Sequence, residues 1–190
     1  RVYPDFPTAL RFSAFNVVSI ATTTGYANTD YNLWPIFAPL WMLFLSSFAT
    51  CSGSTGGGIK MVRAIVLYKQ VFREVMRAIH PSAVHPIKLG SEIVENKIIF
   101  AVLAFGFMYM VSIVSMTLAM TGSGLDIVTA FSAVVACINN TGPGLNQVGP
   151  ATTFAVLTDF QTWVCSFAML LGRLEIFTLL VVLTPAFWRK

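Results

Sequence analysis

The sequence predicts an all-α integral membrane protein, and three observations support this prediction. Only 11% of its 190 residues are charged and 56% are hydrophobic, whereas a soluble domain has roughly 25% charged residues. The charges are unevenly placed, since no Lys or Arg occurs between Phe12 and Ile59 or between Ile98 and Gly172. Each gap can hold a spanning helix, which needs about 20 apolar residues. The third observation is a pair of short apolar segments that end in similar Thr-Gly turns.

Both of these segments are too short to cross a bilayer. The first runs from Pro7 to Ala21 and leads into Thr23-Thr24-Gly25. Its helical residues, about 14 in number, would extend roughly 21 Å at 1.5 Å per residue, whereas the hydrocarbon core is about 30 Å thick. The second runs from Ile127 to Ile138, after Asp126, and leads into Asn140-Thr141-Gly142. Asp126 is the predicted N-cap of this second half-length helix.

Longer helices are expected around these two segments. Trp34 to Ala49 is apolar until Thr50 to Gly58 interrupts it with four glycines, and a helix resumes from Ile59 to Ile79. Lys97 to Met120 is a spanning candidate. Gln161 to Trp188 is another, and it places Arg173 near its middle.

An internal repeat relates the two halves of the chain. Phe12-Ser13-Ala14 precedes the first turn, and Phe131-Ser132-Ala133 precedes the second. A long segment with a central glycine and then a cation follows each turn, which pairs Gly58 and Lys60 with Gly172 and Arg173. The expected units are residues 1–89, without a first helix, and residues 90–190. Because no initiator Met or signal-peptide pattern opens the chain, we expect it to start inside a longer protein.

The basic residues predict the orientation in the membrane. One connection holds most of the cations and a single acid, Glu74, whereas Asp30, Asp126 and Asp159 lie in connections without Lys or Arg. The cations are Lys60, Arg63, Lys69, Arg73, Arg77 and Lys88, with Arg189 and Lys190 at the chain end. Basic connections remain in the cytoplasm. The two Thr-Gly turns are therefore expected to open to the outside.

A half-length helix followed by a Thr-Gly turn favours a cation site. Non-helical backbone at membrane depth is tolerated only where it is buried or lines a wet cavity. The C-terminal end of a helix carries about half a negative charge, and a turn after it can direct carbonyl oxygens at a dehydrated ion. The alternative is an ordinary turn between buried helices.

The residues of these turns carry a family resemblance. Thr23-Thr24-Gly25-Tyr26-Ala27 resembles the potassium-channel filter Thr-Val-Gly-Tyr-Gly, and Asn140-Thr141-Gly142-Pro143-Gly144 resembles a looser copy. The whole chain resembles the third and fourth repeats of the Trk/Ktr/HKT potassium-uptake superfamily, in particular its bacterial TrkH-type subunit. The resemblance implies tandem helix–pore loop–helix repeats similar to potassium channel pore units. The implied filter residues are Thr23, Thr24, Gly25, Tyr26, Asn140, Thr141 and Gly142.

The same resemblance implies a potassium ion bound mainly by the backbone carbonyls of Thr23, Thr24, Asn140 and Thr141. It also implies a gate in the glycine-rich interruption below the filter, formed by Gly53, Ser54, Thr55, Gly56, Gly57 and Gly58. The alternative for this loop is a passive kink or packing notch. A nucleotide P-loop is excluded, because Ile59 separates Gly58 from Lys60 and Met61 replaces the required Ser or Thr.

Arg173 is a mid-membrane cation, which is costly and usually functional. It is expected beneath the filter, as an electrostatic barrier to cations or as a hydrogen-bond donor to the glycine loop. The alternative is a salt bridge, for which Glu175 is a poor partner because it lies two positions away on another helix face.

Residues 60–79 predict an amphipathic helix that touches anionic lipid or docks a cytosolic regulator. The resemblance implies a nucleotide-binding regulatory ring called TrkA in bacteria, a homodimer, and a multi-pass location in the bacterial inner membrane. The positive net charge of +4 does not indicate nucleic acid, since the cations gather in one block between apolar segments.

The predicted function is potassium transport across the membrane through a channel-like, carbonyl-lined filter. The alternative is a cation-coupled secondary transporter, or symporter, with broken helices, but such transporters need inverted repeats and these two copies run in one direction. No catalytic constellation is present, so an enzyme is not expected. A purely structural membrane subunit is the third class. Cys51, Cys137 and Cys165 are expected to be buried free thiols.

Overall fold

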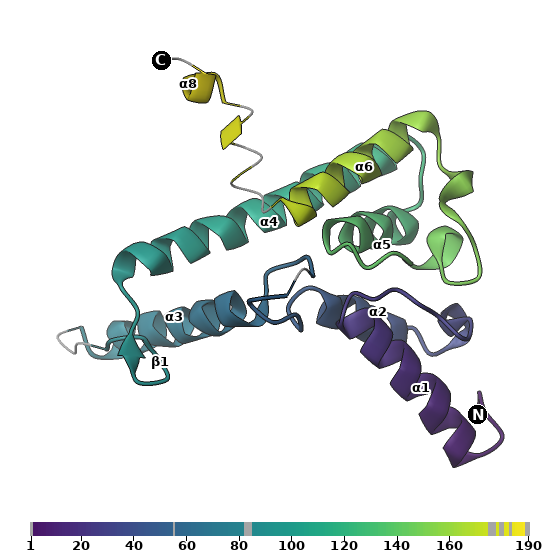
Figure 1. Cartoon of the computed structure of the whole chain (residues 1–190), viewed down its shortest axis with the longest axis horizontal. Helices are drawn as coiled ribbons and strands as arrows, with labels where there is room; N and C mark the ends of the chain where they lie inside the picture. Colours follow the sequence, from purple (N-terminus) through teal and green to yellow (C-terminus); the bar gives the residue numbers. More distant parts are fainter. Residues whose placement is uncertain are drawn as a thin grey trace.

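The computed structural model describes residues 2–54, 56–81, 85–174, 178, 181–182 and 184–188. Thr55, Glu175, Arg189 and Lys190, for which the sequence made predictions, lie outside the described residues. The described chain is helical (Figure 1). Its α-helices are α1 (Phe6–Ala21), α2 (Phe37–Ser46), α3 (Met61–Ile79), α4 (Asn96–Gly122), α5 (Ile127–Ile138), α6 (Asp159–Arg173) and α8 (Pro185–Trp188).

Short elements join these helices. The connection between α3 and α4 contains a small hairpin, in which β1 (Lys88–Leu89) pairs antiparallel with β2 (Glu92–Ile93). A 3-10 turn, η1 (Tyr31–Leu33), lies between α1 and α2, and two more, η2 (Asn146–Val148) and η3 (Phe154–Val156), lie between α5 and α6.

Helix α4 confirms the helix predicted from Lys97 to Met120. It contains 27 residues, which correspond to roughly 40 Å at 1.5 Å per residue. Among the described residues it is the one helix long and apolar enough to cross a membrane. One side of α4 is buried, at Tyr109, Ile113 and Met116 for example, while Phe107 and Leu118 remain exposed.

Helix α5 lies at the centre of the fold. It packs against α4 and α6, which run side by side, and it also contacts α2 (Figure 1). Ala130, Ala133 and Ala136 are fully buried along it, and such small side chains allow close approach of neighbouring helices. Helix α3 packs instead against α4, through a second cluster formed around Val66 and Ile99.

The two half-length helices begin in the same way. Asp5 caps α1, where its carboxylate accepts a hydrogen bond from the Thr8 amide at 3.3 Å. Asp126 caps α5, where its carboxylate accepts from the Thr129 amide at 3.1 Å. The Asp126 carboxylate also accepts from Asn146 at 3.2 Å and so ties the segment after the second turn to the start of α5. Capping therefore defines both helix starts.

Asp126 also gives α5 a pH-dependent contribution to stability. Hydrogen bonding from Thr129 lowers the pKa of Asp126 from its ordinary value of 3.8. A group with a lowered folded-state pKa stabilises the protein above its ordinary pKa and loses that contribution as pH falls through the folded-state value. Asp126→Ala is thus expected to cost about 1 kcal/mol at pH 7, the usual cost of a lost N-cap.

This cost should shrink below pH 3.8, and thermal unfolding of the full-length protein in detergent at pH 7 and pH 3 measures the difference. Asp159→Ala is a suitable control, because Asp159 lies inside the first turn of α6, where Thr158 is the cap. An equal cost for Asp126→Ala at both pH values would contradict the assignment.

Three expectations are wrong in the described part of the chain. The continuous helix from Gln161 to Trp188 is interrupted, since α6 ends at Arg173 with Leu174 as its C-cap. The break follows Gly172, and glycine has low helix propensity. The apolar helix expected from Trp34 to Ala49 is shorter, from Phe37 to Ser46, because Pro35 favours an extended Trp34. Cys51 is exposed rather than buried, since it lies in the loop after α2.

Candidate functional site

The turns after α1 and α5 repeat one backbone hydrogen-bond pattern. After each helix, the first residue donates to the carbonyl four positions back, the second to the carbonyl three back, and the third to the carbonyl five back. The pairs are Thr22–Val18, Thr23–Ile20 and Thr24–Ser19 in the first turn, and Asn139–Val135, Asn140–Cys137 and Thr141–Ala136 in the second. The two turns are therefore equivalent at a constant spacing of 117 residues.

The backbone dihedrals follow the same spacing. Thr23 has φ 56° and Gly25 has φ 83°, while Asn140 has φ 54° and Gly142 has φ 109°. A β-branched residue such as Thr23 rarely adopts positive φ, whereas asparagine and glycine tolerate it. Each turn thus places a left-handed residue two positions before a glycine with positive φ.

This spacing corrects one sequence prediction. Phe12-Ser13-Ala14 and Phe131-Ser132-Ala133 are 119 residues apart, two positions away from the spacing of the turns. Two positions on a helix correspond to about 200° of rotation, so the matched side chains lie on different faces of α1 and α5. The two tripeptides therefore do not occupy equivalent positions, and their use as a marker of the repeat was wrong. The two turns themselves are equivalent.

The two turns lie against each other. A Cβ atom on Gly25 would overlap the carbonyl oxygen of Thr141, and a Cβ atom on Gly142 would lie 3.9 Å from the Gly25 Cα. Both turns line one open cavity of about 630 Å³. Five predicted filter residues line it, namely Gly25, Tyr26, Asn140, Thr141 and Gly142, whereas Thr23 and Thr24 do not.

The glycine-rich loop after α2 lies next to both turns. A Cβ atom on Gly57 would be 2.5 Å from the Asn139 carbonyl oxygen, and one on Gly56 would be 3.0 Å from the Thr23 hydroxyl. Gly57 and Gly58 are buried, while Gly53 and Ser54 are exposed. The sequence-predicted loop therefore contacts the predicted filter through its second half.

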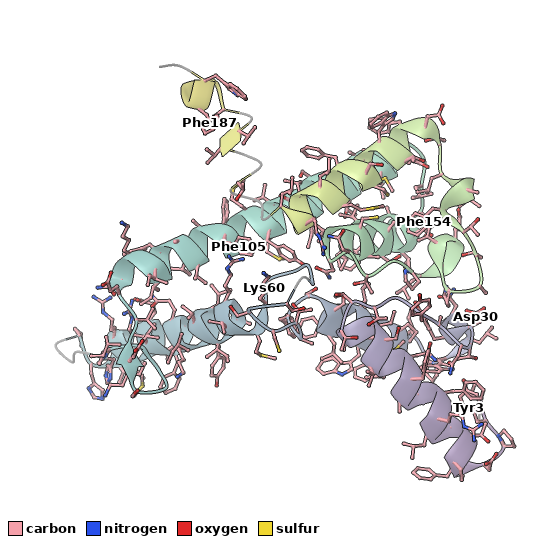
Figure 2. All side chains as sticks on the ribbon, in the orientation of Figure 1. Tyr3, Asp30, Lys60, Phe105, Phe154 and Phe187 are labelled. Carbon is pink, nitrogen blue, oxygen red and sulfur yellow. The ribbon has the colours of Figure 1, made fainter. Side chains whose placement is uncertain are left out.

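A smaller cavity of about 210 Å³ joins this loop to α4 and α6. Ser54, Gly56 and Gly58 line it from the loop, together with Arg173 at the end of α6. Its other lining residues are Lys60, Arg63, Phe105, Tyr109, Ile138, Leu171 and Gly172. Figure 2 labels two of these lining residues, Lys60 directly before α3 and Phe105 on α4.

The charged side chains among the described lining residues of this smaller cavity are cations. Lys60, Arg63 and Arg173 all line it, and the Arg63 guanidinium lies 4.2 Å from the centre of the Phe105 ring. A cation held over an aromatic face is stabilised by the ring quadrupole.

Sequence reasoning missed Asn139 and Tyr109 as site residues, and it paired Gly172 with Gly58 without assigning it a contact. The Asn139 side chain is 0% exposed and accepts a hydrogen bond from the Tyr109 hydroxyl at 2.8 Å. A Cβ atom on Gly172 would overlap the Ile138 carbonyl oxygen, so this glycine permits close contact of α6 with the end of α5. A signal available in the sequence was the tyrosine hydroxyl among the mostly apolar residues of α4.

The long apolar α4, the buried half-length α5 and the two non-helical turns are consistent with a helical membrane protein. Comparison with known proteins identifies the family. A family model described as a cation transport protein, TrkH, matches residues 4–190, and the chain belongs to this family. The resemblance stated from the sequence is thereby confirmed.

The chain is similar to several potassium uptake proteins. It is 45% identical to the Trk system potassium uptake protein TrkH of Salmonella typhimurium over 100% of this chain and 39% of that protein. It is 47% identical to TrkH of Halomonas elongata over 95% of this chain and 37% of that protein. The crystal structure of the potassium transporter TrkH from Vibrio parahaemolyticus matches 99% of this chain and 40% of its own, with a TM-score of 0.91 at 43% identity.

The chain thus spans about two fifths of the length of the relatives that it matches. These relatives are named as uptake proteins, which agrees with the expectation of transport rather than catalysis. Membrane location and an all-helical fold are likewise consistent with the family.

Proposed function

We propose that the chain forms part of a potassium-selective conduction path, in which the turns after α1 and α5 are two strands of the filter. One observation carries this proposal: two turns with the same hydrogen bonds and the same alternation of φ meet at one cavity. The relatives' names give the ion, since they are potassium uptake proteins. Residues 1–89 and 90–190 would then be the third and fourth pore repeats.

The proposed ion ligands are mainly the backbone carbonyls of Thr23, Thr24, Asn140 and Thr141. Both turns follow the C-terminal ends of α1 and α5, where the helix dipole favours a cation. The Thr141 hydroxyl oxygen is buried and makes no hydrogen bond among the described residues. Potassium is the transported ion in this proposal rather than a resident cofactor.

The gate in this proposal is the loop from Gly53 to Gly58 together with Arg173. The loop contacts the second turn at Asn139 and the first at Thr23, and Arg173 lines the cavity on its other side. A positive charge beside an ion path raises the energy of a cation there. Displacement of the loop and of Arg173 would open the path.

The basic side of α3 and the β1–β2 hairpin would face the cytoplasm. Lys69 donates to the Lys88 carbonyl in β1, and Arg73 donates to the Asn96 side chain at the start of α4. These cations therefore lie near one end of α4. Anionic lipid headgroups and a cytosolic nucleotide-binding ring of the TrkA kind are the proposed partners of this face. A homodimer in the bacterial inner membrane, with the filter mouth outside, completes the proposal.

A cation-coupled transporter is the second candidate, and it predicts that potassium flux depends on a second ion. Alternating access moves whole repeats around a fixed site, whereas a filter conducts through carbonyls that stay in place. Turnover with a proton or sodium requirement would therefore favour the transporter.

The test is cation flux through the full-length protein in liposomes, with wild type, Gly142→Ser and Arg173→Ala. Gly142→Ser is expected to alter the preference among potassium, rubidium and sodium, because Gly142 has φ 109° and a side chain there strains the turn. Arg173→Ala is expected to raise the flux without a change in preference, because a cation is removed from the gate.

Gly90→Ser is the matched control. Gly90 also has positive φ, at 64°, but it lies in the hairpin, and a Cβ atom there would meet nothing within 4 Å. The proposal fails if Gly142→Ser behaves as Gly90→Ser does, or if well-folded Arg173→Ala conducts no more than wild type.

A further inference from the structure

The glycine-rich loop is closed at its base by hydrogen bonds between its two ends. The Ile59 amide donates to the Ser47 carbonyl at 2.7 Å, and the Met61 amide donates to the Thr50 carbonyl at 2.9 Å. The Thr50 hydroxyl also donates to the Gly57 carbonyl at 3.2 Å. The entry and exit of the loop are therefore held together, and residues 51–56 lie beyond this closure.

Asn139 fixes this base to the second filter turn. Its side-chain amide donates to the Ser46 hydroxyl oxygen at 2.9 Å and to the Ser47 hydroxyl oxygen at 3.1 Å. The Ser46 hydroxyl donates to the Leu43 carbonyl at 2.6 Å, so its oxygen is left to accept from Asn139. The Asn139 amide nitrogen thus binds the end of α2, immediately before the loop.

The other end of the same amide binds α4. The Asn139 side-chain oxygen accepts from the Tyr109 hydroxyl at 2.8 Å. Tyr109 is 3% exposed and Asn139 is 0% exposed, so the Asn139 amide takes its hydrogen bonds from protein partners. A buried polar group left without its partner is costly, and the Tyr109 hydroxyl therefore holds the Asn139 amide in the orientation that points its nitrogen at Ser46 and Ser47.

The backbone of Asn139 completes the junction. Asn139 is the C-cap of α5 and directly precedes Asn140, the left-handed residue of the second turn. The Gly57 backbone lies against it so closely that a Cβ atom on Gly57 would be 3.0 Å from the Asn139 Cα. One residue therefore contacts the filter turn, the loop base and the spanning helix.

We propose that Asn139, oriented by Tyr109, is the positioning residue that couples the glycine loop to the filter and sets the closed position of the loop. This inference rests on the proposed function, since it assigns a role within the same conduction path. Loosening the junction releases the base of the loop, while the filter turn keeps its own backbone hydrogen bonds at Asn140 and Thr141. Release should therefore favour the open gate without changing which ion is preferred.

The experiment uses Tyr109→Phe in the full-length protein, with Ser115→Ala as a matched control. Both variants remove one hydroxyl from α4, but the Ser115 hydroxyl bonds the Ser112 carbonyl of its own helix and, among the described residues, no other group. Tyr109→Phe is expected to raise potassium flux in liposomes without any regulator by about five-fold, the factor that corresponds to one hydrogen bond. The potassium-to-sodium ratio should remain that of wild type.

Hydrogen–deuterium exchange supplies a second readout that does not depend on conduction. Exchange of the Ile59 and Met61 amides, which close the loop base, should become faster in Tyr109→Phe and stay unchanged in Ser115→Ala. Ser47→Ala removes an acceptor of Asn139 from the loop side and should act in the same direction. Because both changes disrupt one network, the fold-increase in potassium flux of the double variant should be smaller than the product of the two single fold-increases.

Three outcomes would overturn the coupling. Unchanged flux and exchange in both Tyr109→Phe and Ser47→Ala would show that Asn139 does not hold the loop. An altered ion ratio in Tyr109→Phe would show that Asn139 supports the filter instead of the gate. A lower flux with faster exchange would reveal a purely structural role. If wild type itself conducts no cations, the proposed function fails, while the exchange measurement still tests the contact of Asn139 with the loop.

Discussion

Gly25→Ala is expected to abolish potassium flux in the full-length protein, whereas Gly142→Ala should conduct with altered preference. Both glycines have positive φ, so that alanine at either position costs roughly 1–2 kcal/mol of left-handed strain. The two positions differ in the space around them. An added Cβ atom on Gly25 would overlap the Thr141 carbonyl oxygen, while one on Gly142 would lie 3.9 Å from its nearest neighbour.

The substitution at Gly25 therefore pushes apart the two turns that meet at the larger cavity, and it displaces a carbonyl proposed as an ion ligand. Flux of potassium and rubidium into liposomes measures the loss, and retention of the dimer or monomer peak in detergent shows that the protein has folded. Equal flux in Gly25→Ala and Gly142→Ala would contradict the close contact of the turns.

Gly172→Ala is expected to separate α6 from the end of α5 and to lower stability. An added Cβ atom would overlap the Ile138 carbonyl oxygen and lie 2.9 Å from the Asn140 side-chain nitrogen. Backbone atoms cannot rotate away as a flexible side chain can, so α6 must shift. Overpacking of this kind costs typically about 1–3 kcal/mol, and it should appear as a lower thermal unfolding temperature and a lower flux.

Gly106→Ala is the matched control on a neighbouring helix. Its added Cβ atom would lie 3.4 Å from a Leu67 methyl group, which is near ordinary van der Waals contact. Alanine is the better helix former by about 1 kcal/mol, so this variant should be at least as stable as wild type. If Gly172→Ala is as stable as Gly106→Ala, the close approach of α6 to Ile138 is wrong.

Local sequence features predicted the half-length helices well. The bounds of α5 were predicted as Ile127 to Ile138, because an apolar run lies between a capping aspartate and two asparagines that favour turns. The end of α1 at Ala21 and the span of α4 followed from the same kind of signal. These elements depend on the chemistry of neighbouring residues, which a single sequence displays directly.

Contacts between distant residues were not predictable in this way. Asn139 bonds Ser46 and Ser47, which are 93 and 92 positions away, and no periodicity in the chain relates them. The end of α6 at Arg173 was missed because hydrophobicity continues beyond it, while the contact of Gly172 with Ile138 is visible only in three dimensions. The spacing of 117 residues, by contrast, follows from the sequence alone, since it separates Thr24-Gly25 from Thr141-Gly142.

The closed base of the glycine loop limits how far a gate of this kind can travel. Six residues lie between Thr50 and Gly57, and a fully extended chain spans at most about 3.6 Å per residue, so the tip of a tether fixed at both ends reaches at most about 12 Å. This distance is less than half of a hydrocarbon core of about 30 Å. While the base stays closed, the number of residues in this tether therefore limits the movement of the proposed gate.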